Sequence, residues 1–494
     1  MDSASEKPTS AAVLEEPSVD AAKGANAATE HIESLSHDTR AALDKAVSRK
    51  FDRRVLPFCI LMHLCSMIDR ANMGNAKVLG LKEDLHLTGN RFNIAMSLFY
   101  ITYILLEIPA NAVIKRIGPK IWLSFLTTSF GIVTMCQAFA ISFHGIIAVR
   151  IMLGLCDAGV LPGIMFTLAS FYRRHELTTR MGYLSAVVSL SGAFGGLLAT
   201  GFSRIPSGIL HTWRHVLFFE GLITILIGFS VVLLPNSPAT SSFLTEEERI
   251  YACSRLIDEA KALPDEKMNK VTFKRAIMHV PTQLVAVALI CSLCCMGSLH
   301  IFTPTLLQSM GYSGQQAQLM SVPPYVLGAI VCITTATLSD RLRKRGIFFI
   351  CLLAPCIFIG FTLNHFVSSV AVRYFGLFLA VSGGFSSSPL LLSWSVDNNS
   401  GPAVKAIASA YVIGLGGFGQ LLSTWTYIAT EAPKYPTGHS INMACACVLF
   451  LAVGCHSLWA MRENKKRSVG LRDSRLAREH EGLGHDHPAF KFTP

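Results

Sequence analysis

Two pairs of oppositely charged residues lie in apolar segments of this chain, where such residues are rare. Asp69 and Arg70 occupy one segment, and Arg150 and Asp157 occupy another. A charge at bilayer depth costs about 2.5–3.5 kcal/mol on insertion scales, so a functional role is the default hypothesis. Guanidinium groups bind planar carboxylates through paired N–H donors. We therefore predict that Arg70 and Arg150 bind an organic anion.

The helical rise places the two arginines at one depth. Arg70 lies seven residues before the end of its apolar segment and Arg150 five residues after the start of its own, so each lies roughly 8–10 Å below the outer surface. Because seven residues make nearly two turns, His63 shares a helix face with Arg70, and Asp157 shares one with Arg150. The predicted substrate contacts are Arg70, Arg150, Asn72 and His300, and the predicted proton-coupling residues are Asp157, His63 and Asp69.

A structural role is the alternative for these charges. Arg70 would then neutralise Asp69 or Glu107, and Arg150 would neutralise Asp157. Arg70 and Arg150 lie at the same predicted depth on two segments. This favours a functional role, because fixed structural ion pairs seldom recur at one depth on two helices.

Apolar stretches of about 18 to 24 residues recur from Val55 onward, and each is long enough to cross roughly 30 Å of hydrocarbon as a helix. The starts of the second six follow those of the first six by 224 to 226 residues, which indicates a tandem repeat. We predict an all-α membrane protein with twelve transmembrane helices in two six-helix bundles. The predicted spans are 55–77, 91–112, 121–141, 145–168, 180–201, 215–235, 280–302, 316–338, 347–364, 371–394, 404–425 and 440–461.

The composition agrees with a membrane protein. Of the 494 residues, 51% are apolar and only 15% are charged, whereas soluble domains carry about a quarter charged residues. The net charge of +11 is spread over short runs between apolar segments, so no nucleic-acid partner is predicted. Thirteen of the fourteen cysteines lie in apolar segments and are interpreted as packing residues. A metal site at Cys291, Cys294 and Cys295 is the less favoured alternative, and no metal or cofactor is predicted.

Basic residues in the short loops give the orientation. Eleven Lys and Arg residues lie in the loops predicted to be cytoplasmic and six on the opposite side, so both termini are predicted to be cytoplasmic in a multi-pass plasma-membrane protein. The predicted parts are a disordered tail (1–50), an N-terminal bundle (51–235), a cytoplasmic linker (236–279), a C-terminal bundle (280–461) and a C-terminal tail (462–494).

Common catalytic motifs are missing from the sequence. Neither the phosphate-binding G-x-x-x-x-G-K-[ST] nor the hydrolase G-x-S-x-G occurs. We therefore predict that the protein is not an enzyme and that any work it does draws on a gradient.

Several motifs carry a family resemblance. They include Asp69-Arg-Ala-Asn-Met-Gly-Asn-Ala76, Glu107-Ile-Pro-Ala-Asn111, Arg150-Ile-Met-Leu-Gly154 and Phe218-Phe219-Glu220-Gly221. Together they resemble the major facilitator superfamily, in particular the fungal anion:cation symporter branch of allantoate- and nicotinate-permease-like carriers. This resemblance implies alternating access by two rocking bundles, coupling to protons, and a cavity lined by helices 1, 4, 7 and 10.

The resemblance also implies an inner gate. Lys115 and Arg116 precede Asp340 and Arg341 by 225 residues, and the two loops look like the paired cytoplasmic gating motif of the superfamily. Glu107 is assigned to the same gate. We predict import of a small carboxylate with protons. Export of an acidic metabolite and a non-transporting nutrient receptor remain the alternatives.

Overall fold

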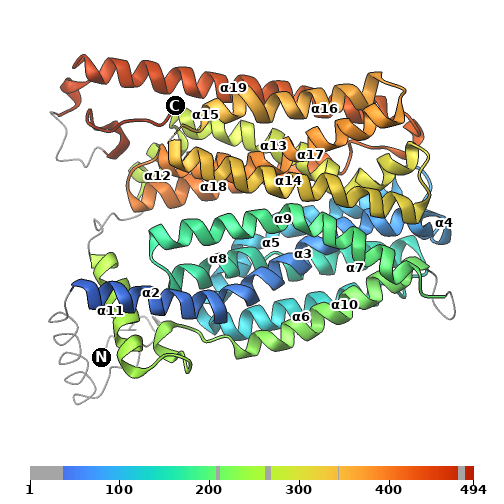
Figure 1. Cartoon of the computed structure of the whole chain (residues 1–494), viewed down its shortest axis with the longest axis horizontal. Helices are drawn as coiled ribbons and strands as arrows, with labels where there is room; N and C mark the ends of the chain where they lie inside the picture. Colours follow the sequence, from blue (N-terminus) through green and yellow to red (C-terminus); the bar gives the residue numbers. More distant parts are fainter. Residues whose placement is uncertain (1–36, 207–211, 262–268, 343, 477–483) are drawn as a thin grey trace, which may run out of the picture.

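The computed structural model describes residues 37–206, 212–261, 269–342, 344–476 and 484–494 (Figure 1). Each predicted span coincides with a helix or with a run of consecutive helices. The first bundle contains α3 (Leu56–Ala76), α5 (Arg91–Ile117), α6 (Pro119–Gln137), α7 (Phe143–Asp157) with α8 (Val160–Phe171), α9 (Arg174–Ser203) and α10 (Thr212–Ser230). The second contains α13 (Val280–Ser309), α14 (Gly314–Leu342), α15 (Gly346–Phe348) with η4 (Phe349–Leu353) and α16 (Ala354–Phe366), α17 (Val370–Asp397), α18 (Pro402–Ser423) and α19 (Pro436–Ser468). The predicted fold class is confirmed.

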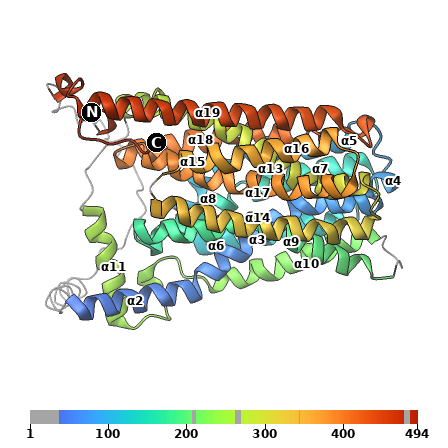
Figure 2. The same cartoon turned by 45° about the horizontal axis from the view of Figure 1, so that its top comes forward.

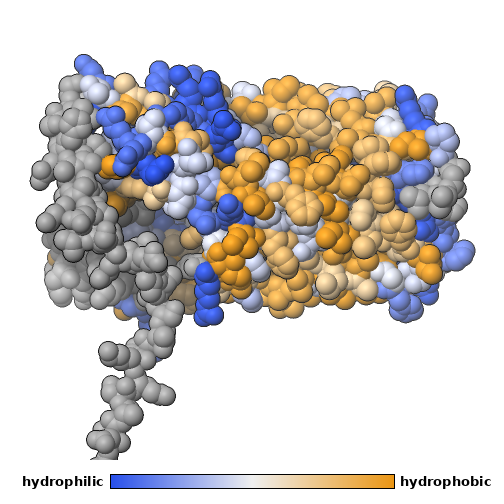
Figure 3. All heavy atoms as spheres, turned by 90° about the horizontal axis from the view of Figure 1, so that it is seen from below, coloured by the Kyte–Doolittle hydropathy of each residue, from blue (hydrophilic) through white to orange (hydrophobic). Residues whose placement is uncertain are grey.

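On the face seen in Figure 3, a broad band of apolar side chains lies between regions of hydrophilic ones at the two ends. Many large apolar side chains are exposed, among them Ile108 at 81% and Leu233 at 77%. In the described chain, ten helical segments are long and apolar enough to cross a membrane. The helices α3 and α6 fall outside this set, and α3 carries four of the predicted site residues. An exposed apolar band of this size is the surface that faces lipid, so the chain is a multi-pass membrane protein.

The two ends of the molecule differ and are named here by what they carry. The linker end holds α2 (His37–Arg54), α11 (Glu246–Lys261) and α12 (Lys270–Ile277) (Figures 1 and 2). The loop end holds the short π-helix η1 (Lys77–Leu81) and α4 (Lys82–Asp84). The bundles meet along α9 with α14, α3 with α13, and α5 with α18. Their boundary therefore runs through the helices that carry the predicted site.

Glycines allow the bundles to approach closely. A Cβ atom on Gly196 of α9 would lie 2.7 Å from the carbonyl oxygen of Gln318 in α14, and one on Gly74 of α3 would overlap the carbonyl of Ile301 in α13. Such contacts require a residue without a side chain. The glycines of α18 are divided, because Gly419 faces Ile290 of its own bundle whereas Gly417 faces Ile104 of α5 in the other bundle.

The fourth predicted span is broken immediately after Asp157. Its first part, α7, ends at Asp157, and α8 begins at Val160. Pro162 lies four residues after Ala158, and a proline has no N–H to donate to that carbonyl and collides with it. The break places Asp157 at a helix terminus rather than within a continuous helix.

The termini and the linker contain more helix than predicted. The predicted disordered tail reached residue 50, but residues 37–50 belong to α2; residues 1–36 lie outside the described part. The linker contains α11 and α12. Residues 484–494 return to the second bundle, where the Thr493 carbonyl accepts hydrogen bonds from Trp394 and Asn398.

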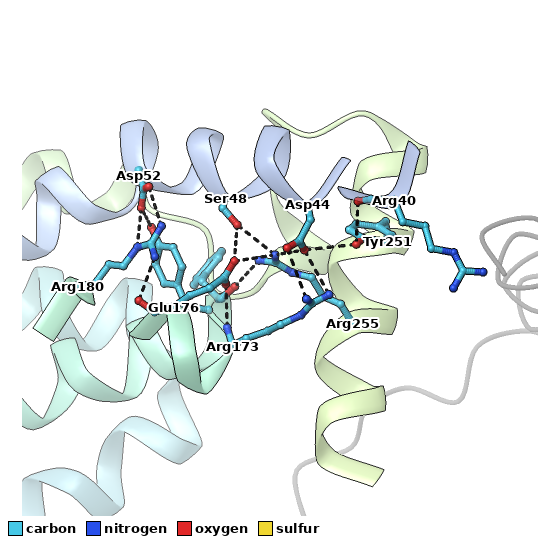
Figure 4. Close-up of polar contacts among 11 residues, drawn as sticks. Arg40, Asp44, Ser48, Asp52, Arg173, Glu176, Arg180, Tyr251 and Arg255 are labelled. Carbon is cyan, nitrogen blue, oxygen red and sulfur yellow. Dashed lines mark hydrogen bonds and ion pairs between the residues drawn. The ribbon is translucent and has the colours of Figure 1, made fainter. Parts of the chain in front are cut away.

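Polar contacts hold α2 against α9 and α11 (Figure 4). Arg180 binds Asp52 at 2.8 Å, and Arg255 of α11 binds Asp44 at 2.9 Å and Glu176 at 3.3 Å. These are tertiary contacts between segments about 80 to 210 residues apart, which explains why sequence reasoning missed a helix there. Tyr251 donates to Asp44 in the same network. Burial and the Asp44 carboxylate raise the pKa of Tyr251, so its hydroxyl stays protonated and remains a donor at neutral pH.

Arg255→Ala is expected to detach α2 from the first bundle. The Arg255 side chain is 1% exposed, and its removal leaves Glu176 without its cation, while Asp44 keeps only Arg173 at 3.2 Å. Breaking a buried ion pair costs about 3–5 kcal/mol, and the partial exposure of Asp44 puts this change at the low end. Trypsin cleavage within residues 37–54 of the purified protein should accelerate at least threefold. Glu247→Ala, at an exposed position on α11 that leaves every trypsin site unchanged, is the matched control, and equal cleavage of the two variants would contradict the assignment.

Candidate substrate site

Four charged residues form two ion pairs between α3 and α7. Arg70 Nη2 lies 2.7 Å from Asp157 Oδ2, and Arg150 Nη1 lies 3.1 Å from Asp69 Oδ2. All four side chains are at most 5% exposed. The pairing is crossed: each arginine binds an acid on the opposite helix, and neither of the intrahelical pairings considered from the sequence is formed. We call these residues the charged quartet.

The two arginines of the quartet have different surroundings. Arg150 is fully buried, and its Nε and Nη2 atoms have no hydrogen-bond partner among the described residues. Arg70 reaches the other bundle, where its Nη1 donates to Gln420 Oε1 of α18 at 3.4 Å. Arg70 therefore lies at the boundary between the bundles, whereas Arg150 supports the quartet from within the first bundle.

Aromatic rings of α5 surround the Arg70 guanidinium. Its Cζ lies 4.9 Å from the ring centroid of Tyr103, 5.3 Å from that of Phe99 and 5.8 Å from that of Tyr100. Cation–π contacts of this kind contribute about 0.5–2 kcal/mol each, more where water is excluded. They hold the guanidinium in place while Asp157 balances its charge.

Asp157 has a second partner on α3. Ser66 Oγ donates to Asp157 Oδ1 at 2.6 Å, while the other carboxylate oxygen binds Arg70. A serine hydroxyl can donate or accept, so it can stay bonded to this carboxyl group in either protonation state.

A third carboxyl group, Glu220 of α10, lies beside the quartet and was not among the predicted site residues. Asn72 Nδ2 donates to Glu220 Oε2 at 2.8 Å, and Asn75 Nδ2 donates to Asn72 Oδ1 at 2.8 Å. Gln318 of the other bundle donates to the Asn75 carbonyl at 3.4 Å. The predicted residue Asn72 therefore links Glu220 to the bundle boundary. An acidic residue within an apolar span was visible in the sequence at Glu220, but the sequence did not show that Asn72 is its hydrogen-bond partner.

The two predicted histidines are both buried but differ in their contacts. His300 of α13 lies 3.1 Å from Ser191 Oγ of α9 through its Nε2, a contact between the bundles. Its ring packs edge-on against Tyr325 and Phe385. His63 of α3 is 3% exposed, and its Nδ1 has no partner among the described residues.

The predicted gating residues are not all brought together. Glu107 is half-buried on α5, one turn after Tyr103, and Arg116 is exposed near the end of α5, where the Lys115 side chain lies outside the described part.

Asp340 and Arg341 are exposed at the end of α14. Asp340 Oδ1 binds Arg345 Nη2 at 3.0 Å within its own bundle, rather than joining the two predicted loops. Arg345 also binds Asp397 at 2.5 Å.

All fourteen cysteines are unpaired; eight of them are buried, as expected of packing residues, whereas Cys136, Cys351, Cys447 and Cys455 are exposed. Within the described ranges, no group of three His, Cys, Asp or Glu side chains is placed to hold a metal ion.

Two helical bundles with buried charges at their boundary define a membrane transporter of the two-bundle class. The chain belongs to the Major Facilitator Superfamily, whose profile matches residues 59–451. It is a transporter and not an enzyme. This membership confirms the resemblance seen in the sequence.

Curated relatives and solved structures agree with this assignment. A Saccharomyces cerevisiae protein described as a high-affinity nicotinic acid transporter is 31% identical over 456 residues, which cover 91% of this chain and 85% of the relative. An uncharacterized transporter of Schizosaccharomyces pombe is 32% identical over 430 residues, covering 86% and 84%. The proton:xylose symporter XylE of E. coli shares the fold, with a TM-score of 0.65 at 14% identity over 82% of this chain and 95% of XylE.

Proposed function

We propose that this transporter imports a small organic anion, a carboxylate, together with protons across the plasma membrane. The observation that carries the proposal is Arg70: a buried guanidinium at the bundle boundary, bound to an acid of one bundle and to an amide of the other. Alternating access requires the cargo to lie between the bundles, and Arg70 is the cation of the quartet that lies there.

Charge balance supports coupling to protons. The quartet contains two arginines and two aspartates, so its formal charges cancel. An added carboxylate would leave one buried negative charge uncompensated, at a cost of several kcal/mol. A proton on Asp157 removes that excess, because it neutralises the aspartate and frees Arg70 for the incoming carboxylate.

The hydrogen bonds between the bundles support an inward-facing state. Ser97 of α5 lies 2.7 Å from Thr424 Oγ1, and Asn93 Nδ2 donates to the Thr424 carbonyl at 2.6 Å. Gln315 reaches the Ser203 carbonyl at 3.5 Å. These contacts lie toward the loop end. With the linker end in the cytoplasm, as the distribution of basic residues predicts, they form the closed outer seal.

The similarity to the Saccharomyces cerevisiae nicotinic acid transporter supports the choice of cargo. Nicotinic acid is a small aromatic carboxylate, and that protein is 31% identical to this chain. One predicted role changes: Arg150 was predicted to bind the cargo, but because it is fully buried beside Asp69 we assign it to ordering the quartet instead. The other predicted roles are part of the same proposal. Asn72 and His300 contact the cargo, His63 and Asp69 assist Asp157, and the gate lies at Glu107, Lys115, Arg116, Asp340 and Arg341.

Uptake of labelled carboxylates tests this function. In a permease-deficient host that expresses the chain, accumulation of nicotinate or another small carboxylate should rise as the external pH falls and collapse with a protonophore. Arg150→Ala should lower uptake at least tenfold at equal surface expression. If accumulation instead increases when the proton gradient is reversed, the protein is an exporter. If only neutral solutes are taken up, the anion assignment is overturned.

A further inference from the structure

Lys77, the first residue after α3, lies between aromatic rings of the two bundles. Its Nζ is 4.6 Å from the ring centroid of Phe92 in α5 and 5.0 Å from that of Phe302 in α13. The two rings meet edge to face with centroids 6.1 Å apart, and they are 3% and 0% exposed. The half-buried ammonium group therefore bridges the boundary through π-faces, and no ion pair is among its described contacts.

We call the arrangement of Lys77 between Phe92 and Phe302 the clamp. It lies where the two bundles approach each other most closely. The Gly74 backbone of α3 meets the Ile301 carbonyl one residue before Phe302, and Gly314 of α14 packs against the Val78 carbonyl, directly after Lys77. The Phe302 ring also packs on Tyr427, with centroids 5.3 Å apart. Because Phe92 and Phe302 belong to different bundles, any rocking motion that opens the loop end must separate their rings.

Separation changes what the ammonium group can bind. While the seal is closed, the π-faces of two rings stabilise the cation, and they do so most strongly where water is excluded. When Phe302 leaves with the second bundle, Lys77 remains on the first bundle beside one ring, with its charge open to the outside. Lys77 then lies seven residues, about two helical turns, beyond Arg70 toward the loop end.

We propose that Lys77 is the first anion-binding residue at the outer mouth, clamped by Phe92 and Phe302 in the sealed state and released to a substrate carboxylate when the seal opens. This inference rests on the proposed function and adds a capture step to it. The carboxylate passes from a lysine point charge at the mouth to the guanidinium of Arg70, which suits bidentate binding.

Uptake kinetics test the capture role. Lys77→Gln should raise the KM for external carboxylate at least tenfold while Vmax stays within twofold, because capture is impaired and the inner site is intact. Lys77→Arg, the matched control, keeps the charge and the aromatic contacts and should stay within threefold of the wild-type KM. An unchanged KM in Lys77→Gln, or an equal loss in Lys77→Arg, would overturn the capture role.

Thiol labelling tests the clamp without any cargo. In a background in which the exposed Cys136, Cys351, Cys447 and Cys455 are changed to serine, Ser97→Cys places a thiol at the seal contact with Thr424, and an impermeant maleimide added outside reports its exposure. Adding Phe302→Leu or Lys77→Gln should raise the labelling rate at least threefold, whereas Leu105→Ala, at an exposed site on α5, should leave it unchanged. Unchanged labelling in Phe302→Leu and Lys77→Gln would overturn the clamp. If the wild-type chain takes up no carboxylate, the proposed function and the capture step fail, while the labelling result decides the clamp independently.

Discussion

Arg70→Gln is expected to reduce carboxylate uptake at least 100-fold. The substitution removes the guanidinium that contacts both bundles and leaves Asp157, 1% exposed, without its cation. Removal of one partner from a buried ion pair costs about 3–5 kcal/mol, so lower thermal stability should accompany the loss of uptake. Initial uptake rates, normalised to surface expression, measure the first effect, and melting of the purified protein measures the second.

Two further variants separate the binding role of Arg70 from its structural role. The double variant Arg70→Gln/Asp157→Asn removes both charges of the pair and should recover most of the lost stability while remaining inactive. Arg70→Lys keeps the charge but loses the planar fork and should retain only a small part of the activity. Wild-type uptake by the double variant would show that Arg70 only neutralises Asp157.

The helices were predictable because the bilayer constrains them strongly. A chain that crosses hydrocarbon must satisfy its backbone hydrogen bonds internally, so each crossing appears as a long apolar segment. The predicted spans 55–77 and 280–302 match the starts of α3 and α13 to within one residue. The break after Asp157 was within reach of the same reasoning, since Pro162 was visible in the sequence and the physical rule for proline is local.

The members of the charged quartet were predictable, but their pairing was not. A charge within an apolar span is conspicuous, and this signal selected Arg70 and Asp157. Which acid an arginine meets depends on how α3 and α7 are rotated about their axes, and sequence depth alone does not fix that rotation. Asp69 and Arg70 are adjacent in the chain, yet they bind residues seven positions apart on α7.

The contacts that sequence reasoning missed are tertiary ones between distant segments. Glu220 and Asn72 are 148 residues apart, and Arg255 and Asp44 are 211 residues apart. The helix α2 is mostly polar along its length, so it lacks the apolar pattern that identifies a span. Its order depends on acidic groups that meet arginines of α9 and α11, a pairing that only the folded structure displays (Figure 4).

Asp157→Asn is expected to abolish concentrative uptake while preserving exchange. The amide has nearly the shape of the carboxylic acid and can keep the contact with Ser66, but it neither binds nor releases a proton in the working pH range. Arg70 stays free for the carboxylate throughout the cycle, so cargo can still cross in both directions. The rate of counterflow of labelled carboxylate should remain within about threefold of wild type. A pH gradient should no longer raise the internal concentration of the carboxylate above the external one.

Asp157→Glu is the matched control for this uncoupling. It keeps the titratable group, lengthens it by one methylene, and should retain accumulation against a gradient with an altered KM. If Asp157→Asn still accumulates cargo under a pH gradient, the proton is carried by another carboxyl group. Glu220 is then the next candidate, because its described hydrogen bond comes from an amide rather than a cation and its Oε1 has no partner in the described part of the chain. In that case Glu220→Gln, rather than Asp157→Asn, should remove the pH dependence of uptake, because Glu220 would then be the carboxyl group that carries the proton.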